Sequence, residues 1–192
     1  MSKYTAILLA AGSGSRFDPS GKSNKLLEPL TDGCAVAVTS AANLLAIMPN
    51  VLAVVRPGSD QLHAELRAIG CDVTVCPQAS EGMGASLAHA LAQTSGADGW
   101  LVALADMPYL RPGTIKALLE ALQAGADIAA PVHNGRRGNP VAFGRAHLSH
   151  LLGLSGDTGA RSLLQDYPLQ LVEVNDPGVH LDIDLPRDLP FH

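Results

Sequence analysis

The chain has 192 residues, of which 47% are hydrophobic and 16% charged, a composition typical of a globular protein with a sizeable core. Its formal net charge of −5 argues against the basic surface that a nucleic-acid-binding protein presents. No apolar stretch is long enough to span a bilayer, and the N-terminal apolar run is shorter than that of a signal peptide. We therefore expect a cytoplasmic protein that binds neither nucleic acid nor membranes.

Short apolar runs alternate with segments of helical periodicity. The apolar runs predict strands over residues 6–11, 51–55, 73–75, 99–104, 128–131, 141–143 and 170–174. The helical patterns cover residues 35–47, 60–68, 84–93, 112–124 and 160–167. This alternation predicts an α/β fold, a three-layer Rossmann-like sandwich with a mostly parallel sheet, over a single domain of residues 1–192. Ligands of such sheets bind beyond the carboxyl ends of the strands, which is where functional residues are expected.

The first predicted strand ends in a glycine-rich loop that carries basic residues. Gly12 and Gly14 let backbone N–H groups approach a phosphate closely, and Arg16 and Lys25 add positive charge at the same edge. This combination suits a bound triphosphate. An ordinary glycine-rich connection from a strand to a helix is the alternative.

Two widespread phosphate-binding motifs do not fit this loop. Gly21, Lys22 and Ser23 match the end of the Walker pattern, but the position of its first glycine is occupied by Arg16. In the dinucleotide-binding fingerprint, the third glycine position is occupied by Phe17. The loop therefore belongs to another type.

Two segments of the chain carry carboxylates that could bind a metal ion. Asp106 comes directly after the predicted strand 99–104, and Asp182 and Asp184 share a face if residues 181–186 are extended. Carboxylate oxygens are hard ligands suited to a Mg²⁺ ion that also holds substrate phosphates. The alternatives are a turn or helix cap at Asp106 and a polar edge segment for the other pair.

Three further segments combine glycines with polar residues. Gly82 and Ser86 lie where a helix begins, so its free N–H groups could bind an anion or a base edge, unless Ser86 only caps the helix. Arg136 and Arg137 lie between glycines and suit phosphate, or form a solvated hairpin tip. Residues 156–161 read G-D-T-G-A-R, a binding loop or a capped helix start.

Taken in order, these motifs resemble those of nucleotidyltransferases. The loop matches L-A-A-G-x-S-x-R…K, and later segments match A-D-M-P, E-G-M-x-x-S-L, G-D-x-G-A-R and D-I-D. The resemblance is closest to the molybdenum-cofactor branch, whose members transfer CMP or GMP to molybdopterin. It implies a sandwich of the nucleotide-diphospho-sugar transferase type.

The resemblance also implies a role for individual residues. The implied catalytic residues are Arg16, Lys25 and Asp106. The implied nucleotide-binding residues are Leu9, Ala10, Ala11, Gly12, Gly14, Ser15, Arg16, Lys25, Gly82 and Ser86. The implied Mg²⁺ ligands are Asp106, Asp182 and Asp184, with Asp182 as the first choice to join Asp106. The implied acceptor-binding residues are Arg137, Asn139, Asp157 and Arg161.

The chain departs from the family pattern at three places. Similar cytidylyltransferases have R-G-H-P where this chain has R-G-N-P, so Asn139 stands in place of a histidine. The interval between Arg16 and Lys25 is longer than expected, which leaves Lys22 as an alternative to Lys25. Leu185 replaces the threonine of D-I-D-T-P.

The implied reaction is attack of an acceptor phosphate oxygen on the α-phosphorus of CTP, with release of pyrophosphate. The sequence L-A-A-G favours CTP, since the guanylyl branch usually reads L-A-G-G. The expected partners are CTP and a phosphorylated acceptor such as molybdopterin, and a molybdoenzyme that receives the product is a further candidate. The alternatives are a guanylyltransferase for the same cofactor, a sugar- or alcohol-phosphate nucleotidyltransferase, and a non-catalytic nucleotide-binding partner of a molybdoenzyme.

Overall fold

One eight-stranded sheet runs through the computed structural model, which describes residues 3–156, 160 and 163–189. Its strands are β1 (Tyr4–Ala10), β2 (Val51–Val55), β3 (Asp72–Val75), β4 (Gly99–Leu104), β5 (Ile128–His133), β6 (Arg136–Arg137), β7 (Val141–Gly144) and β8 (Leu169–Glu173). They follow the order β3-β2-β1-β4-β7-β5-β6, and β8 also pairs with β5. β7 runs antiparallel to β4 and β5, and β6 antiparallel to β5, whereas the other pairs are parallel. The predicted α/β fold with a mostly parallel sheet is confirmed.

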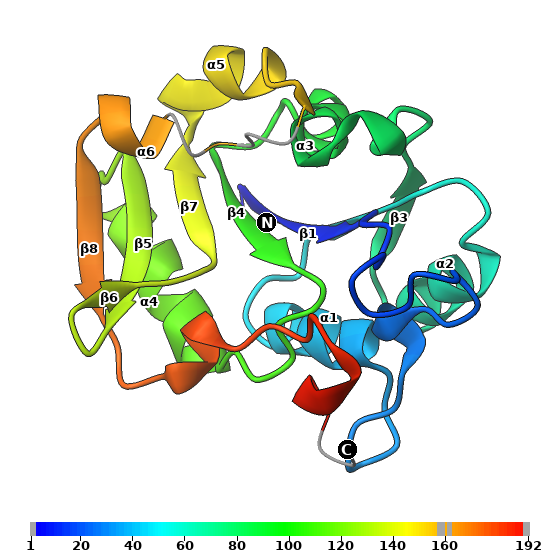
Figure 1. The fold of residues 1–192 in the computed structure, drawn as a ribbon. Coiled ribbons are helices and arrows are strands. Elements are labelled where there is room, and N and C mark those ends of the chain that lie inside the picture. The colour runs from blue at the N-terminus through cyan, green and yellow to red at the C-terminus, as the bar shows by residue number, and fades with distance from the viewer. Residues whose placement is uncertain (1–2, 157–159, 161–162, 190–192) are drawn as a thin grey trace.

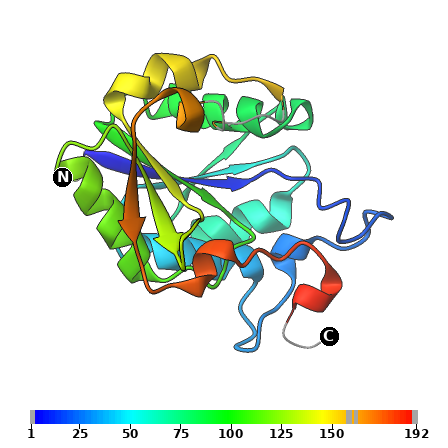
Figure 2. The same cartoon turned by 60° about the vertical axis from the view of Figure 1, so that its left-hand side comes forward.

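Helices cover both faces of the sheet, which gives the three predicted layers (Figure 1). One face carries α1 (Val36–Leu45), α2 (Asp60–Ala68) and α4 (Pro112–Gln123). The other carries α3 (Met83–Gln93) and the short helices α5 (Leu148–Leu152) and α6 (Leu163–Asp166), and Figure 2 shows the two layers edge-on. The described 3₁₀ turns are η1 (Lys25–Leu27), η2 (Ala79–Glu81), η3 (Arg145–His147), η5 (Pro177–His180) and η6 (Pro186–Asp188).

The central strand β1 contributes to the core on both of its faces. Ala6 and Leu8 are buried in the cluster that includes residues of α1, α2 and α4. Ile7 is buried in the second cluster, which includes residues of α3 and α5. A strand covered on both faces needs apolar residues at every position, which explains why this run does not alternate with polar residues. None of the described helices is long and apolar enough to cross a membrane.

β5 and β6 are connected by a hairpin, which the sequence offered only as an alternative to a loop. Asn134 and Gly135 both adopt positive φ angles, of 53° and 73°, and they join His133 to its cross-strand partner Arg136. Asn-Gly with two positive φ angles is a strong signal for a two-residue hairpin turn. The sequence predicts a cationic loop here with a solvated hairpin tip as the alternative, and the alternative is the observed form, with a second strand only two residues long. The short helix α5 was missed, whereas the predicted bounds of β2, α2 and β4 agree with the structure.

Asp176 fastens the C-terminal segment to the start of α4. It is 2% exposed, and its Oδ2 accepts the N–H of Arg111 at 2.9 Å and the hydroxyl of Thr114 at 2.6 Å. Its Oδ1 accepts the N–H of Gly178 at 2.9 Å. A carboxylate at a helix N-terminus is favoured by the helix dipole, so this buried charge is stabilised by the groups around it.

Two glycines allow the C-terminal segment to pass close to other backbone segments. A Cβ atom at Gly178 would collide with the backbone of Tyr109, and one at Gly138 would collide with Val179. The N–H of Asn139 also donates to the oxygen of Val179 at 3.0 Å. The segment that carries Asp182 and Asp184 is therefore held between the residues after β4 and the residues after β6.

We predict that Asp176→Ala lowers the free energy of unfolding by about 3 kcal/mol, because it leaves the buried donors of Thr114 and Gly178, and the N–H of Arg111, without this acceptor. Thermal or urea unfolding measures the change. Asp60→Ala at the exposed start of α2 is the control, with an effect under about 1 kcal/mol. Equal effects of the two substitutions would contradict the prediction.

We also predict that His147 makes the fold sensitive to acid. It is 3% exposed, neither ring nitrogen has a hydrogen-bond partner in the described part of the chain, and its ring packs edge-on against Tyr167. Burial lowers the pKa of His147 below its ordinary value of 6.5, an effect that Asp127 opposes and His150 reinforces. The unfolded chain therefore binds a proton that the folded chain excludes, and stability decreases as the pH falls through about 6.5.

Melting temperatures measured between about pH 8 and pH 5 test this prediction. The His147→Phe variant keeps an aromatic ring but has no proton to gain, so its melting temperature should decrease less than that of the wild type. His63→Phe on α2 is the control and should keep the wild-type dependence. The prediction fails if His147→Phe and wild type have the same pH dependence.

Candidate active site

The carboxyl ends of β1 and β4 lie side by side, because these strands are parallel neighbours. β1 leads into the glycine-rich loop, and β4 ends at Leu104, two residues before Asp106. The C-terminal segment reaches the same edge, where the N–H of Ile183 donates to the backbone oxygen of Asp106 at 2.8 Å. Three segments far apart in sequence therefore meet where ligands of parallel sheets bind.

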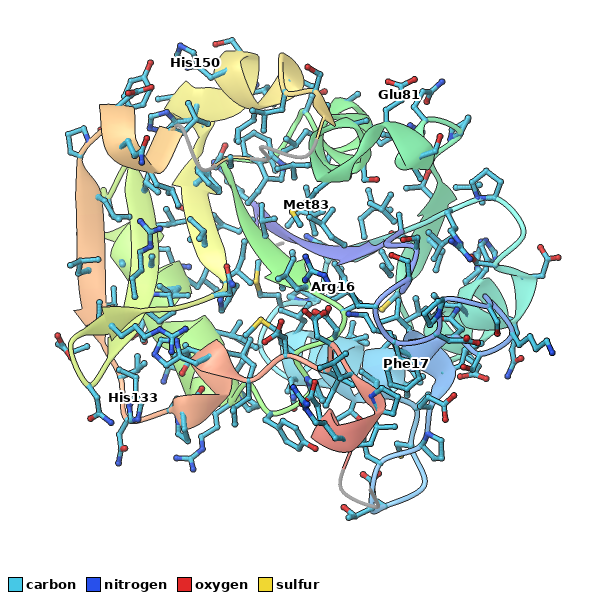
Figure 3. The ribbon with its side chains drawn as sticks, viewed as in Figure 1. Arg16, Phe17, Glu81, Met83, His133 and His150 are labelled. Atoms are coloured by element: carbon cyan, nitrogen blue, oxygen red, sulfur yellow. The ribbon has the colours of Figure 1, made fainter. Side chains whose placement is uncertain are left out.

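Two cations and two carboxylates form a cluster at this edge. Nζ of Lys25 donates to Oδ2 of Asp106 at 2.6 Å and to Oδ1 of Asp184 at 3.0 Å. A guanidinium nitrogen of Arg16 donates to Oδ2 of Asp184 at 3.0 Å, and Figure 3 shows Arg16 among the side chains at this place. The Lys25 side chain is 12% exposed and that of Arg16 is 78% exposed. Lys25 is thus an enclosed cation, whereas Arg16 is open to ligands from solvent.

Lys25 and Asp184 keep their charges at neutral pH. Burial alone would lower the pKa of Lys25, but the hydrogen bonds and charges of Asp106 and Asp184 outweigh burial and raise it. The hydrogen bond from Lys25 lowers the pKa of Asp184 against the opposing effect of burial, and Arg16 lowers it further. Lys25 is therefore an ammonium ion and Asp184 a carboxylate when a substrate arrives.

Asp18 folds the residues between Arg16 and Lys25 into a compact turn. Its carboxylate accepts the backbone N–H groups of Ser20 and Ser23, both at 2.8 Å, and also their hydroxyls. These hydrogen bonds hold the pKa of Asp18 well below its ordinary value. The longer interval in this chain is therefore an ordered turn that brings the chain back toward the sheet.

η1 then places Lys25 in the cluster. Asn24 caps this turn by accepting the N–H of Leu26 at 3.1 Å, and Lys25 is the first residue of the turn. Lys22 is exposed and lies outside the cluster that Lys25 forms with the carboxylates. Of the two lysines considered from the sequence, the structure brings Lys25 to Asp106.

The other predicted nucleotide-binding residues occupy two segments beside the cluster. In the first, Ala10 and Ala11 are buried and Gly12 and Ser15 are exposed, so the chain turns outward after β1. Gly14 has φ of +66°, a left-handed conformation that favours glycine. In the second, Gly82 precedes α3, and Ser86 is a buried residue of its first turn.

A cavity of about 910 Å³ extends from this edge across the sheet. Leu9, Leu104 and Met107 border it at the ends of β1 and β4, and Met83 and Leu87 contribute from α3. Its polar side chains are those of Arg136, Arg137, Asn139, Gln165, His180 and Asp182. Apolar walls with a few polar groups are typical of small-molecule sites, and the volume lies in their range of roughly 300–1,000 Å³.

The structure places the predicted acceptor-binding residues in two groups. Arg137 and Asn139 line the cavity, whereas Asp157 and Arg161 lie outside the described residues. His180, which belongs to none of the sequence motifs, lines the same cavity as Asn139. It is the last residue of η5, and its place two residues before Asp182 in the chain was the signal that could have identified it.

The carboxylates at this edge include donors that suit a divalent cation. Oδ1 of Asp106 is buried and has no hydrogen-bond partner in the described structure, and both oxygens of Asp184 contact cations. These hard oxygen donors fit a divalent ion. Asp184 rather than Asp182 shares Lys25 with Asp106, and Asp182 lines the cavity instead. The described residues contain no group of three acidic, histidine or cysteine side chains arranged for a metal, so the expected trio is not assembled by the protein alone.

Comparison with known proteins identifies the family. The model of the MobA-like NTP transferase domain matches residues 6–174. The chain belongs to this family. The purine catabolism protein PucB of Bacillus subtilis is 30% identical over 95% of this chain and 92% of its own length. The nicotine blue oxidoreductase of Paenarthrobacter nicotinovorans is 27% identical over 94% and 91% of the two chains.

Solved structures share this fold. The chain is similar to Rv0371c of Mycobacterium tuberculosis, with a TM-score of 0.82, 27% identity and coverage of 97% and 95% of the two chains. A structure of Rv0371c in complex with manganese gives a TM-score of 0.80, 25% identity and the same coverage. The sequence-based assignment to a nucleotidyltransferase family is therefore confirmed as the MobA-like NTP transferase family, and the cluster lies within the matched domain except for Asp184.

Proposed function

We propose that this nucleotidyltransferase transfers CMP from CTP to a phosphorylated acceptor, with molybdopterin as the favoured acceptor, and releases pyrophosphate. The observation that carries the proposal is the cluster of Arg16, Lys25, Asp106 and Asp184, whose chain neighbours Met107 and Asp182 line a cavity with basic residues on its wall. A triphosphate needs cations and free N–H groups, and the acceptor needs a separate pocket with its own cations.

In this mechanism the protein mainly positions groups and neutralises charge. The N–H groups of residues 11–15 hold the terminal phosphates, and the exposed Arg16 stabilises the departing pyrophosphate. Lys25 stabilises the charge on the α-phosphoryl group, and its raised pKa keeps it protonated while it does so. The acceptor phosphate is already largely ionised near pH 7, so the step needs no general base.

Asp106 and Asp184 are the residues that would hold a divalent cation, for which we propose Mg²⁺. Asp106 has a buried oxygen without a partner in the described structure, which is a ready donor for such an ion. When bound, the ion would act as a Lewis acid on phosphate oxygens. We propose no direct ligand role for Asp182, because its place on the cavity wall suits contact with the acceptor better.

Two segments support the proposed nucleotide and the proposed acceptor site. L-A-A-G at residues 9–12 supports CTP by its resemblance to the cytidylyl branch. Arg137 and Asn139 support an acceptor site within the cavity, and the neutral amide of Asn139 cannot supply the proton that a histidine could. We further propose that residues 1–192 act as one domain, in the cytoplasm, and that a molybdoenzyme receives the product.

A pyrophosphate-release assay tests the proposal. Purified protein receives Mg²⁺ and CTP, GTP, ATP or UTP, each with and without molybdopterin. We expect release with CTP only when molybdopterin is present. Release with GTP would assign the protein to guanylyl transfer. If molybdopterin gives no release, sugar phosphates are tried next, and release with one of them would make it the acceptor instead. No release with any acceptor would contradict an enzymatic role.

Variants test the residue roles in the same assay. We predict that Lys25→Met and Asp106→Asn each lower turnover by about 100-fold or more, since each removes a charge that faces the reacting phosphates. Lys22→Met removes a nearby exposed charge and should keep wild-type turnover. Full turnover in Lys25→Met or Asp106→Asn would show that these residues are not catalytic.

We predict a separate effect for His180, which lies on the acceptor side of the cavity. Its Nε2 lies 3.4 Å from the carbonyl oxygen of His133, so Nε2 carries the proton and Nδ1 is left as an acceptor in the neutral ring. His180→Ala should raise the KM for the acceptor about tenfold, the value of one hydrogen bond, and leave the KM for CTP unchanged. His63→Ala on α2 is the control. Equal rises in both KM values would indicate a general structural role.

A further inference from the structure

Lys25 occupies the place between two carboxylates that a metal ion would also need. Its single ammonium group lies 2.6 Å from an oxygen of Asp106 and 3.0 Å from an oxygen of Asp184. The lysine side chain is enclosed, with 12% exposure, and therefore has few other positions open to it. Lys25 thus links the two carboxylates directly.

Both oxygens of Asp184 already contact cations. Oδ1 accepts from Lys25 and Oδ2 accepts from Arg16. The carboxylate of Asp106 is engaged on one side only, because Oδ2 accepts from Lys25 and the buried Oδ1 has no partner in the described part of the chain. A metal ion could gain Oδ1 of Asp106, but at Asp184 it would lie next to the ammonium group of Lys25 or the guanidinium group of Arg16.

The charges of the cluster also oppose the binding of a divalent cation. The cluster contains two carboxylates and two cationic side chains, so its charges already compensate each other. A divalent ion added to this arrangement would lie close to an ammonium group in a partly buried site, where like charges repel strongly. The repulsion between the ion and the ammonium group weakens when Lys25 moves to another anion.

We propose that Lys25 is a built-in competitor of the divalent cation: in the nucleotide-free protein it holds Asp106 and Asp184 together and keeps the cation out. The bound triphosphate offers Lys25 and Arg16 its own oxygens, and their departure releases both carboxylates for the ion. This step rests on the proposed function, because it names the triphosphate as the anion that attracts the lysine. Nucleotide and metal binding are then coupled, and by linkage each strengthens the other.

The rival interpretation is an ion pair with a purely structural role. A buried pair of this kind stabilises its partners' positions without controlling a ligand. The two interpretations differ in what happens to metal affinity when the ammonium group is removed. Competition predicts tighter metal binding in the nucleotide-free protein, whereas a structural pair predicts unchanged or weaker binding, because the carboxylates lose their order.

The experiment measures Mn²⁺ binding to nucleotide-free protein from the electron paramagnetic resonance signal of free Mn²⁺. Lys25→Met should bind Mn²⁺ about 5- to 150-fold more tightly than wild type, the usual range of a coupling between sites. Lys25→Arg keeps the charge and should remain close to wild type. Lys22→Met is the matched control, since it removes one exposed charge from the same segment and should also remain close to wild type.

A double variant locates the ion. Lys25→Met with Asp106→Asn should lose the gain in affinity, because the oxygen that had no partner is no longer part of a carboxylate. If the double variant keeps the gain, the ion lies elsewhere and the proposal is overturned. Unchanged Mn²⁺ affinity in folded Lys25→Met would overturn it as well, and so would an equal gain in Lys22→Met.

Arg16→Met keeps the test decisive if Lys25→Met fails to fold. It frees Oδ2 of Asp184 and leaves Lys25 in place, so a smaller gain in Mn²⁺ affinity is expected, and no gain would overturn the proposal. The readout does not depend on turnover. Tighter Mn²⁺ binding by the variants, together with no CMP transfer by the wild-type protein, would support the competition and contradict the proposed reaction. CMP transfer by the wild-type protein without tighter binding by the variants would do the opposite.

Discussion

The contact between Lys25 and the two carboxylates of Asp106 and Asp184 is the interaction on which the site depends. These residues come from the first loop, the end of β4 and the C-terminal segment, which are separated by 81 and 159 positions in the two hydrogen bonds. A buried charge is stable only when it is paired, so each residue needs the others in place. Much of the surrounding structure brings these three segments together.

The sheet positions two of the three segments. β1 and β4 are parallel neighbours, so the loop after β1 and Asp106 after β4 necessarily lie at the same edge. The C-terminal segment arrives by a different route. Buried Asp176 fixes it to the start of α4, and Gly178 lets it pass against Tyr109, before Ile183 bonds to the backbone of Asp106. Hydrogen bonds thus hold the C-terminal segment against the edge of the sheet.

The same cluster relates stability to function. The ion pairs that fix Lys25 are the ones that the proposed nucleotide and cation would have to rearrange, so in this proposal the site exchanges one set of charge pairs for another. The cavity next to the cluster is different in character, with apolar walls and a few polar groups. In the proposed function, the charged cluster would carry out the phosphate chemistry and the mostly apolar cavity would recognise the rest of the acceptor.

The sequence by itself determined the elements whose signals are local. The strands β2 and β4 and the helix α2 were predicted with their observed bounds, because unbroken apolar runs and helical periodicity are properties of neighbouring residues. Arg16, Lys25 and Asp106 were selected because they follow strand ends, and the structure brings them to one edge. The local signal of the Asn134–Gly135 turn was also present, although it was not used.

Only the tertiary structure decided which groups touch. Asp182 and Asp184 are two residues apart and would share a face of an extended segment, so their spacing could not show which of them reaches Lys25. The backbone path that Asp176 and Gly178 fix brings Asp184 to Lys25. Lys22 and Lys25 were likewise distinguished by the turn around Asp18, and His180 joined the cavity wall through packing against the residues after β6. Contacts between distant segments depend on the three-dimensional path of the backbone, and no pattern of neighbouring residues encodes that path.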